Sequence, residues 1–146
     1  MKTMTYIINL AVFALFSQVF AQAPDWEDDP GAYFYTSFLV GGVVLYDGEQ
    51  MGGDGDIFAA FDAAGNVRGV GVQLSPPFGP YLGTPVFEMT MRSNADGDVL
   101  SFKYYDTSND AILDITETYT FSTGENVGSV ISPIIFDASL PDLTCC

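Results

Sequence analysis

The sequence contains no histidine and only four lysine or arginine residues, against 19 aspartates and glutamates. Without histidine, Ser-His-Asp and Cys-His catalysis and most zinc sites are excluded. Without a basic face, nucleic-acid binding is excluded as well, because phosphate contacts need clustered lysine and arginine. The many acidic residues leave a two-carboxylate glycosidase open, although no pair of carboxylates stands out. We therefore expect the protein not to be an enzyme.

Cysteine is almost absent too, since the only two are the neighbours Cys145 and Cys146. Adjacent cysteines cannot join distant parts of one domain, and a disulfide between them closes only a strained ring. In an oxidising compartment they can instead form disulfides with other chains. Three states are left open at this point: disulfides to other chains, which we favour, a ring between the two cysteines, and free thiols.

The N-terminus has the parts of a secretory signal peptide. Lys2 supplies the positive start, residues 7–20 form a mostly apolar run, and Ala21 ends the small-residue cleavage site. We expect residues 1–21 to be removed, which predicts a secreted protein, extracellular or at the cell surface. The run is short for a membrane span, so no span is expected after removal, with an uncleaved anchor as the alternative. The remaining chain has 19 acidic residues against three basic ones, a net charge of −16.

Alternation of apolar and polar residues predicts strands along most of the remaining chain. Leu100, Phe102 and Tyr104 alternate with polar residues, and threonines alternate with other residues between 115 and 121. The predicted strands are 33–46, interrupted by the glycines 41–42, then one within the run 54–62, and then 67–72, 85–92, 99–106, 111–121 and 130–136. No segment after residue 21 predicts a helix.

This spacing predicts one all-β domain over residues 32–137, an antiparallel β-sandwich of jelly-roll or immunoglobulin-like type with about eight strands. An acidic N-terminal segment, 22–31, precedes the domain and a tail, 138–146, follows it. The hairpin formed by the runs 54–62 and 67–72 is its centre. Phe58, Phe61, Val70 and Val72 offer apolar area there, and the small residues beside them allow another layer to pack closely.

The acidic residues suggest calcium, the natural counter-ion for clustered carboxylates outside the cell. Asn94, Asp96 and Asp98 have the spacing that opens a calcium loop, but the glycine and glutamate that complete an EF-hand are absent. The alternative is that each aspartate hydrogen-bonds to its own turn. The candidate ligands are Asp54, Asp56, Asp96, Asp98, Asp106 and Asp110.

Three aromatic residues are candidates for a binding surface. Trp26, the only tryptophan, lies in the acidic segment, and Phe78 and Tyr81 lie in a loop rich in proline and glycine. Exposed aromatic rings contact carbohydrates and protein partners. The alternative for Trp26 is that it covers one end of the core.

Several short motifs resemble a module repeated in large secreted and surface proteins of marine and freshwater bacteria. Trp26 is followed by Asp56-Ile57-Phe58-Ala59-Ala60-Phe61, by Val67-Arg68-Gly69-Val70 and by Phe102-Lys103-Tyr104-Tyr105-Asp106. The match covers about residues 26–136. The resemblance implies a non-catalytic β-sandwich of adhesive or structural proteins, whose function is poorly defined. It also implies one polar cluster of Asp56, Arg68 and Asp106.

Two functions are compatible with these observations. The first, which we favour, is a secreted structural subunit that assembles with copies of itself into an extracellular fibre or surface layer. Segments 22–31 and 137–146 would then reach a neighbour by adding a strand to an exposed sheet edge. The second is an extracellular adhesion module that binds carbohydrate or a surface protein through Trp26, Phe78 and Tyr81.

Overall fold

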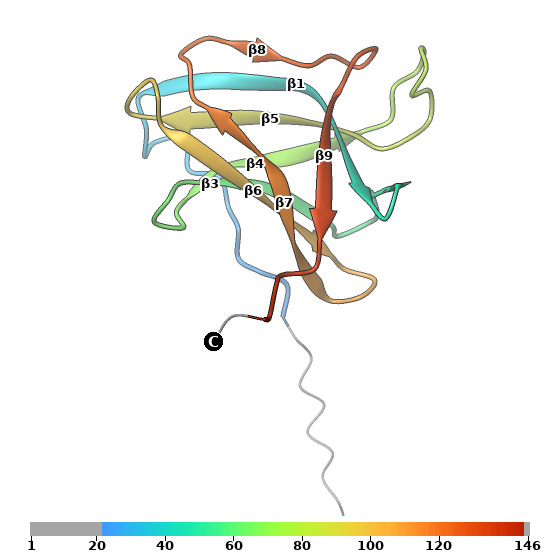
Figure 1. The fold of residues 1–146 in the computed structure, drawn as a ribbon. Helices are drawn as coiled ribbons and strands as arrows, with labels where there is room; N and C mark the ends of the chain where they lie inside the picture. Colours follow the sequence, from blue (N-terminus) through green and yellow to red (C-terminus); the bar gives the residue numbers. More distant parts are fainter. Residues whose placement is uncertain (1–21, 145–146) are drawn as a thin grey trace, which may run out of the picture.

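The computed structural model describes residues 22–144, which form nine strands and no helix (Figure 1). The all-β prediction is therefore confirmed for this part of the chain. The predicted signal peptide and the two cysteines lie outside the described residues. Within residues 22–144, no helix is long and apolar enough to cross a membrane.

The long strands agree closely with the predicted ones, and β6 has the predicted bounds. Two short strands, β2 and β8, were not predicted. The strands are β1 (Tyr35–Tyr46), β2 (Glu49–Gln50), β3 (Ile57–Phe61), β4 (Val67–Leu74), β5 (Val86–Ser93), β6 (Val99–Asp106), β7 (Ala111–Thr120), β8 (Asn126–Val127) and β9 (Ile134–Ser139).

The strands form a single sheet that closes on itself, where the sequence predicted two stacked sheets. The order is β1-β5-β4-β3-β6-β7-β9, and β9 pairs again with β1 (Figure 1). The sheet is also not wholly antiparallel, because β8 and β9 both run parallel to β1. Alternation along a strand specifies an inner and an outer face, and one closed sheet satisfies it as well as two sheets do.

The sheet closes at a joint where β9 lies between β1 and β7, and β9 pairs with these two strands over unequal lengths. β9 pairs with β1 over five positions, from Gly42↔Ile134 to Tyr46↔Ala138. It pairs with β7 at only two positions, near its C-terminal end. Beyond these two positions, the Glu117 carboxylate on β7 accepts a hydrogen bond of 2.7 Å from the backbone N–H of Asp137 on β9. A side chain thus takes the place of a backbone hydrogen bond between the two strands.

Glycine at the centre of β1 lets the chain that precedes β9 approach closely. The pairing of β1 with β5 shifts between Leu39 and Gly42, which confirms the irregularity predicted at the two glycines. A β-carbon on Gly41 would lie 2.3 Å from the backbone carbonyl of Ser129. Position 41 therefore accepts only glycine unless the loop moves.

The last strand begins four residues later than predicted, at Ile134 instead of 130. Pro133 immediately precedes it, and proline cannot donate a hydrogen bond to a ladder. The strand also continues to Ser139, into the segment predicted as tail.

Aromatic rings fill the space inside the closed sheet. Phe58 is fully buried at its centre, with its ring centroid 5.0 Å from that of Phe136 and 5.5 Å from that of Phe87. Phe102 lies 4.9 Å from Phe136 on the other side. These rings come from β3, β5, β6 and β9, so the core joins strands that are far apart in the sequence.

Candidate functional site

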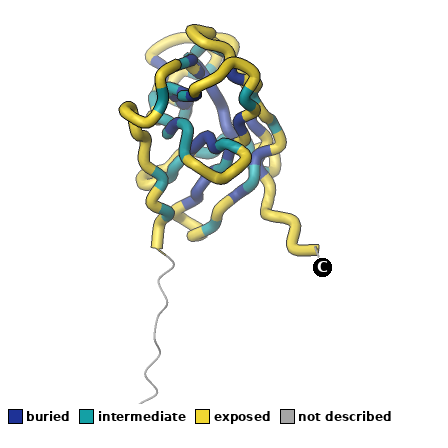
Figure 2. Tube along the Cα trace, turned by 90° about the vertical axis from the view of Figure 1, so that its left-hand side faces the viewer, coloured by how far each residue is buried: buried dark blue, intermediate teal, exposed yellow. Residues whose placement is uncertain are grey.

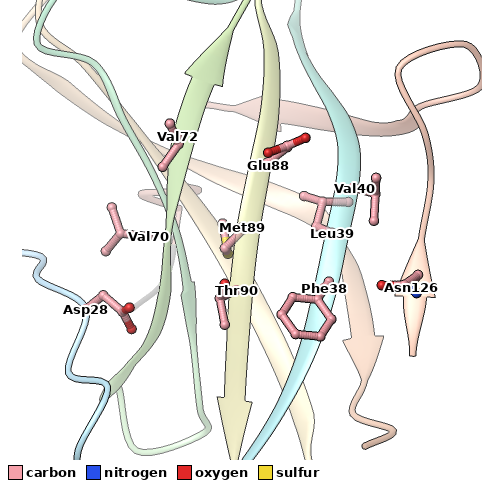
Figure 3. A pocket seen from close by; sticks show the side chains of 10 residues that line it. All are labelled: Asp28, Phe38, Leu39, Val40, Val70, Val72, Glu88, Met89, Thr90 and Asn126. Atoms are coloured by element: carbon pink, nitrogen blue, oxygen red, sulfur yellow. The ribbon is translucent and has the colours of Figure 1, made fainter. Parts of the chain in front are cut away.

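A hollow lies on the outer face of β4, β5 and β1, and we call it the outer hollow (Figure 3). Val70 and Val72 on β4 form one side of it, and Phe38 and Val40 on β1 form the other. Its volume is about 360 Å³. The remaining lining residues are Asp28, Leu39, Glu88, Met89, Thr90 and Asn126.

The register of the strands places these side chains in two rows across the face. Phe38 pairs with Thr90 and also with Asn126 of β8, which gives the first row. Val72 pairs with Glu88, which belongs to the second row. Apolar groups thus stand on both sides, and a carboxylate and a hydroxyl lie between them on the middle strand.

Arg68 is the centre of a second, polar cluster at the end of the β3–β4 hairpin. Its Nε donates to Asp62 Oδ2 at 3.0 Å, and its Nη1 donates to Ser93 Oγ and to the carbonyl oxygen of Arg92, both at 3.2 Å. Its guanidinium lies 4.0 Å from the centroid of the Tyr33 ring, a cation–π contact. The cluster thus connects Tyr33, which precedes β1, with the hairpin and with β5.

The predicted cluster of Asp56, Arg68 and Asp106 is not formed. Arg68 follows the turn of the hairpin, so antiparallel pairing brings it beside the end of β3. Asp56 precedes the start of β3, at the other end of that strand, and Asp106 ends β6 beside it. Arg68 instead forms ion pairs with Asp62 at 3.0 Å and with Asp98 at 3.9 Å. Asp98 is one of the clustered aspartates, whereas Asp62, six residues before Arg68 across a tight turn, was not singled out from the sequence.

Asp62 has a depressed pKa because its carboxylate holds the hairpin turn. Burial alone raises the pKa, but hydrogen bonds from Asn66, Arg68 and Ala64 outweigh it and lower the pKa from 3.8 to about 2. Its Oδ1 accepts bonds from the backbone N–H groups of Ala64 and Asn66, both at 2.9 Å. The ionised form therefore stabilises the folded protein.

We expect the free energy of unfolding to fall as the pH drops from about 4 to about 2, because Asp62 is protonated more easily unfolded than folded. Asp62→Asn should be less stable than the parent by about 1–2 kcal/mol near neutral pH, with the difference vanishing near pH 2. Urea unfolding at several pH values measures this. Asp54→Asn is the control, because Asp54 makes no hydrogen bond within the described residues; equal pH profiles for the parent and Asp62→Asn would contradict the assignment.

The six candidate calcium ligands fall into two groups at opposite ends of β6. Asp96 and Asp98 lie in the turn before it, while the other four lie at its C-terminal end. Asp54, Asp56 and Asp106 line one shallow hollow of about 400 Å³. Among residues 22–144, no three acidic or cysteine side chains are arranged to hold a metal ion.

Most of these aspartates are engaged in hydrogen bonds that shape turns. Asp56 accepts bonds from Tyr104 Oη at 2.7 Å and from the backbone N–H of Thr107 at 2.8 Å. Asp106 accepts bonds from Ser108 and Asn109. Burial alone would raise the pKa of Asp106, but these hydrogen bonds outweigh burial, so its pKa lies below the usual value. Asp110 accepts from Tyr105, Asp96 from Thr123, and Asp98 from Ser93. Calcium binding stays a prediction.

The three candidate aromatic residues do not share a surface. Trp26 packs edge-on against Phe61, with ring centroids 5.0 Å apart, at the end of β3. A hollow of about 490 Å³ lies beside it, lined also by Ser101, Lys103 and Ile112. Phe78 and Tyr81 lie in the loop between β4 and β5, at the opposite end of β4 from the hairpin turn (Figure 1).

The acidic N-terminal segment lies on its own domain. Arg92 Nε and Nη2 donate to the two oxygens of Asp28 at 2.8 and 2.7 Å, and these bonds raise the pKa of Arg92. The ion pair of Asp28 with Arg92 and the contact of Trp26 with Phe61 hold the segment against the domain. Trp26 and Asp28 thus contact their own domain in this structure, and the contact of residues 22–31 with a neighbouring copy stays a prediction.

The closed sheet also limits strand addition. In the described part of the chain, β3, β4, β5 and β6 are each hydrogen-bonded to a strand on both sides. β7 pairs with β9 only at Asp114 and Ile115, so residues 116–120 of β7 have no ladder partner on that side.

Comparison of the chain with protein-family models, with curated proteins and with solved structures finds no match. The resemblance to a repeated bacterial module thus stays a prediction.

Proposed function

We propose that the chain is a secreted, non-catalytic structural subunit that associates with copies of itself outside the cell. The observation that carries the proposal is a run of solvent-exposed aliphatic side chains on β9 and the segment after it. We call this run the C-terminal strip, and it consists of Ile134, Ile135, Leu140 and Leu143. Figure 2 shows the chain after β9 exposed along its length. Contact between two copies would remove this apolar surface from water.

The use of the acidic residues supports a structural role. Asp56, Asp62 and Asp106 each accept hydrogen bonds that hold a turn in shape. Asp62 and Asp106 bond within their own turns, whereas Asp56 bonds to the distant residues Tyr104 and Thr107. Because these carboxylates are hydrogen-bonded within the fold, other exposed side chains are the groups available for contact with another molecule.

Charge sets the conditions for this association. Two copies with a net charge of −16 each repel one another, and salt screens that repulsion. The C-terminal strip leads toward Cys145 and Cys146, outside the described residues, and disulfides to another chain would make the contact covalent. Association should therefore grow with ionic strength and persist best without reductant.

Ile135→Lys tests the role of the C-terminal strip. It places a cation in the strip, which lowers the overall repulsion between copies, so a loss of association can come only from the lost apolar contact. Ile112→Lys on β7 is the matched control, because Ile112 is 40% exposed and Ile135 is 37% exposed. We expect sedimentation velocity at high salt to show monomers for Ile135→Lys and oligomers for Ile112→Lys. Oligomers from both variants would contradict the role of the strip.

A binding module is the second candidate function, and the outer hollow is the observation that favours it. Apolar walls around a few polar groups are typical of a ligand-binding surface. The chemistry of its lining points to one class of partner.

A further inference from the structure

We propose that the outer hollow docks a short extended segment of a partner protein, in which a lysine or arginine lies between aliphatic residues. The cationic side chain would lie on Glu88, and the aliphatic side chains would pack on the walls. This proposal does not depend on self-association, which uses the C-terminal strip.

The shape of the hollow suits one extended chain. Neighbouring strands of a sheet lie about 4.8 Å apart, so the side chains of β4 and β1 stand about 10 Å apart across β5. Figure 3 shows Val70 and Val72 on one side of β5, and Phe38 and Val40 on the other. Val72 is 61% exposed, so apolar area is available to a ligand.

The polar groups between the walls lack partners of their own. Within residues 22–144, neither the Glu88 carboxylate nor the Thr90 hydroxyl makes a hydrogen bond. Both lie on β5, and Asn126 lies at the β8 side of the hollow. A cationic donor placed between apolar walls would gain a charge-assisted bond to Glu88, partly shielded from water.

The charge of the lining selects the sign of the partner. Asp28 and Glu88 are its charged residues, and the cation next to it, Arg92, is bound to Asp28. An anionic segment would meet the Glu88 carboxylate, for which no ion pair exists within residues 22–144. The hollow therefore complements a basic segment.

A second copy of this chain fits the hollow poorly. The three cations of residues 22–144 all form ion pairs: Arg68 with Asp62, Arg92 with Asp28, and Lys103 with Asp114. A copy would bring carboxylates to Glu88 and would have to break an ion pair to bring a cation. The charges thus favour a different, basic protein.

Fluorescence anisotropy with a labelled peptide of valine, lysine and serine tests the proposal, using the chain from residue 22 to residue 146. In this peptide valine, lysine and valine stand at every second position, with serine between them, so that all three face the hollow when the peptide is extended. A peptide with glutamate in place of lysine is the comparison. We expect the lysine peptide to bind, the glutamate peptide not to bind, and the affinity to fall about tenfold between about 0.02 M and about 0.3 M salt. Equal binding of both peptides, or binding of neither, would overturn the proposal.

Two substitutions in the hollow locate the binding, and each has a control substitution outside it. Val72→Lys should abolish it, whereas Val99→Lys, at a valine that is 55% exposed on β6 outside the hollow, should leave it unchanged. Glu88→Gln should weaken it about tenfold, and Glu49→Gln, with the same change of charge on β2, should not. If both lysine variants bind equally, the site lies elsewhere. If Val72→Lys changes only the oligomeric state, the hollow contacts a second copy, and the proposal is wrong.

Discussion

Replacing Phe58 by alanine is expected to lower the free energy of unfolding by about 3–5 kcal/mol, enough to unfold a domain of ordinary stability. The side chain is fully buried at the point where rings from four strands meet. Alanine would leave a cavity that the surrounding rings cannot fill without changing the spacing of the closed sheet. The loss should therefore be at the upper end of the range for such substitutions.

Phe34→Ala is the matched control for Phe58→Ala, because the same atoms are removed from a side chain that is 89% exposed. Its stability should change by less than about 0.5 kcal/mol. Urea unfolding followed by circular dichroism measures both variants. A loss below about 1 kcal/mol in Phe58→Ala would mean that the aromatic cluster is not the main support of the fold.

Gly41→Ala has the second largest expected effect, a loss of about 2–3 kcal/mol. The added methyl group would overlap the backbone of Ser129, at 2.3 Å, and backbone cannot rotate away as a side chain can. The loop must then move outward, and β9 begins only five residues after Ser129. We expect the β1–β9 joint to open more often, since β9 is bonded to β7 at only two positions.

Amide hydrogen exchange distinguishes this local effect from a general loss of stability. In Gly41→Ala, the amides of β9 should exchange much faster while those of β6 change less. Gly31→Ala is the control, because a methyl group there would meet only Asp29 Oδ1 at an ordinary 3.5 Å. Uniform acceleration over all strands would show that the loop does not control the closing joint.

The strands were predictable because their determinants are local. Apolar and polar residues alternate through 99–106, and that segment forms β6 with the same bounds. The turn after Tyr46 follows from Asp47 and Gly48, which both have positive φ. The closure of the sheet was not predictable in this way, because it depends on the contact of β9 with β1, some 90 residues earlier.

The candidate site was less predictable than the fold. Outward side chains on three different strands build the outer hollow, and their order in the sheet is β4, β5, β1. Nothing in the sequence places Phe38 two strands away from Val72. The role of the acidic residues was hard to predict for a related reason, because turn aspartates and metal ligands have the same local pattern in a sequence. Within residues 22–144 the six candidate ligands lie in two separate groups, at the two ends of β6.

The net negative charge affects binding at both proposed surfaces, the outer hollow and the C-terminal strip. The cations of the described residues are used within the fold, so its surface field is strongly negative. Such a protein attracts basic partners and associates with itself only when salt screens the repulsion. The outer hollow and the C-terminal strip would thus respond to ionic strength in opposite directions.

The mass of the chain from residue 22 to residue 146 in solution, measured by light scattering without reductant, tests the structural-subunit role most directly. Self-association predicts monomers of about 14 kDa, at about 110 Da per residue, at about 0.01 M salt and oligomers or polymers at about 0.5 M salt. Ile135→Lys should remain monomeric at both. A monomer of the parent chain at every salt concentration would contradict the role, and the binding of a basic partner would then be the function to pursue.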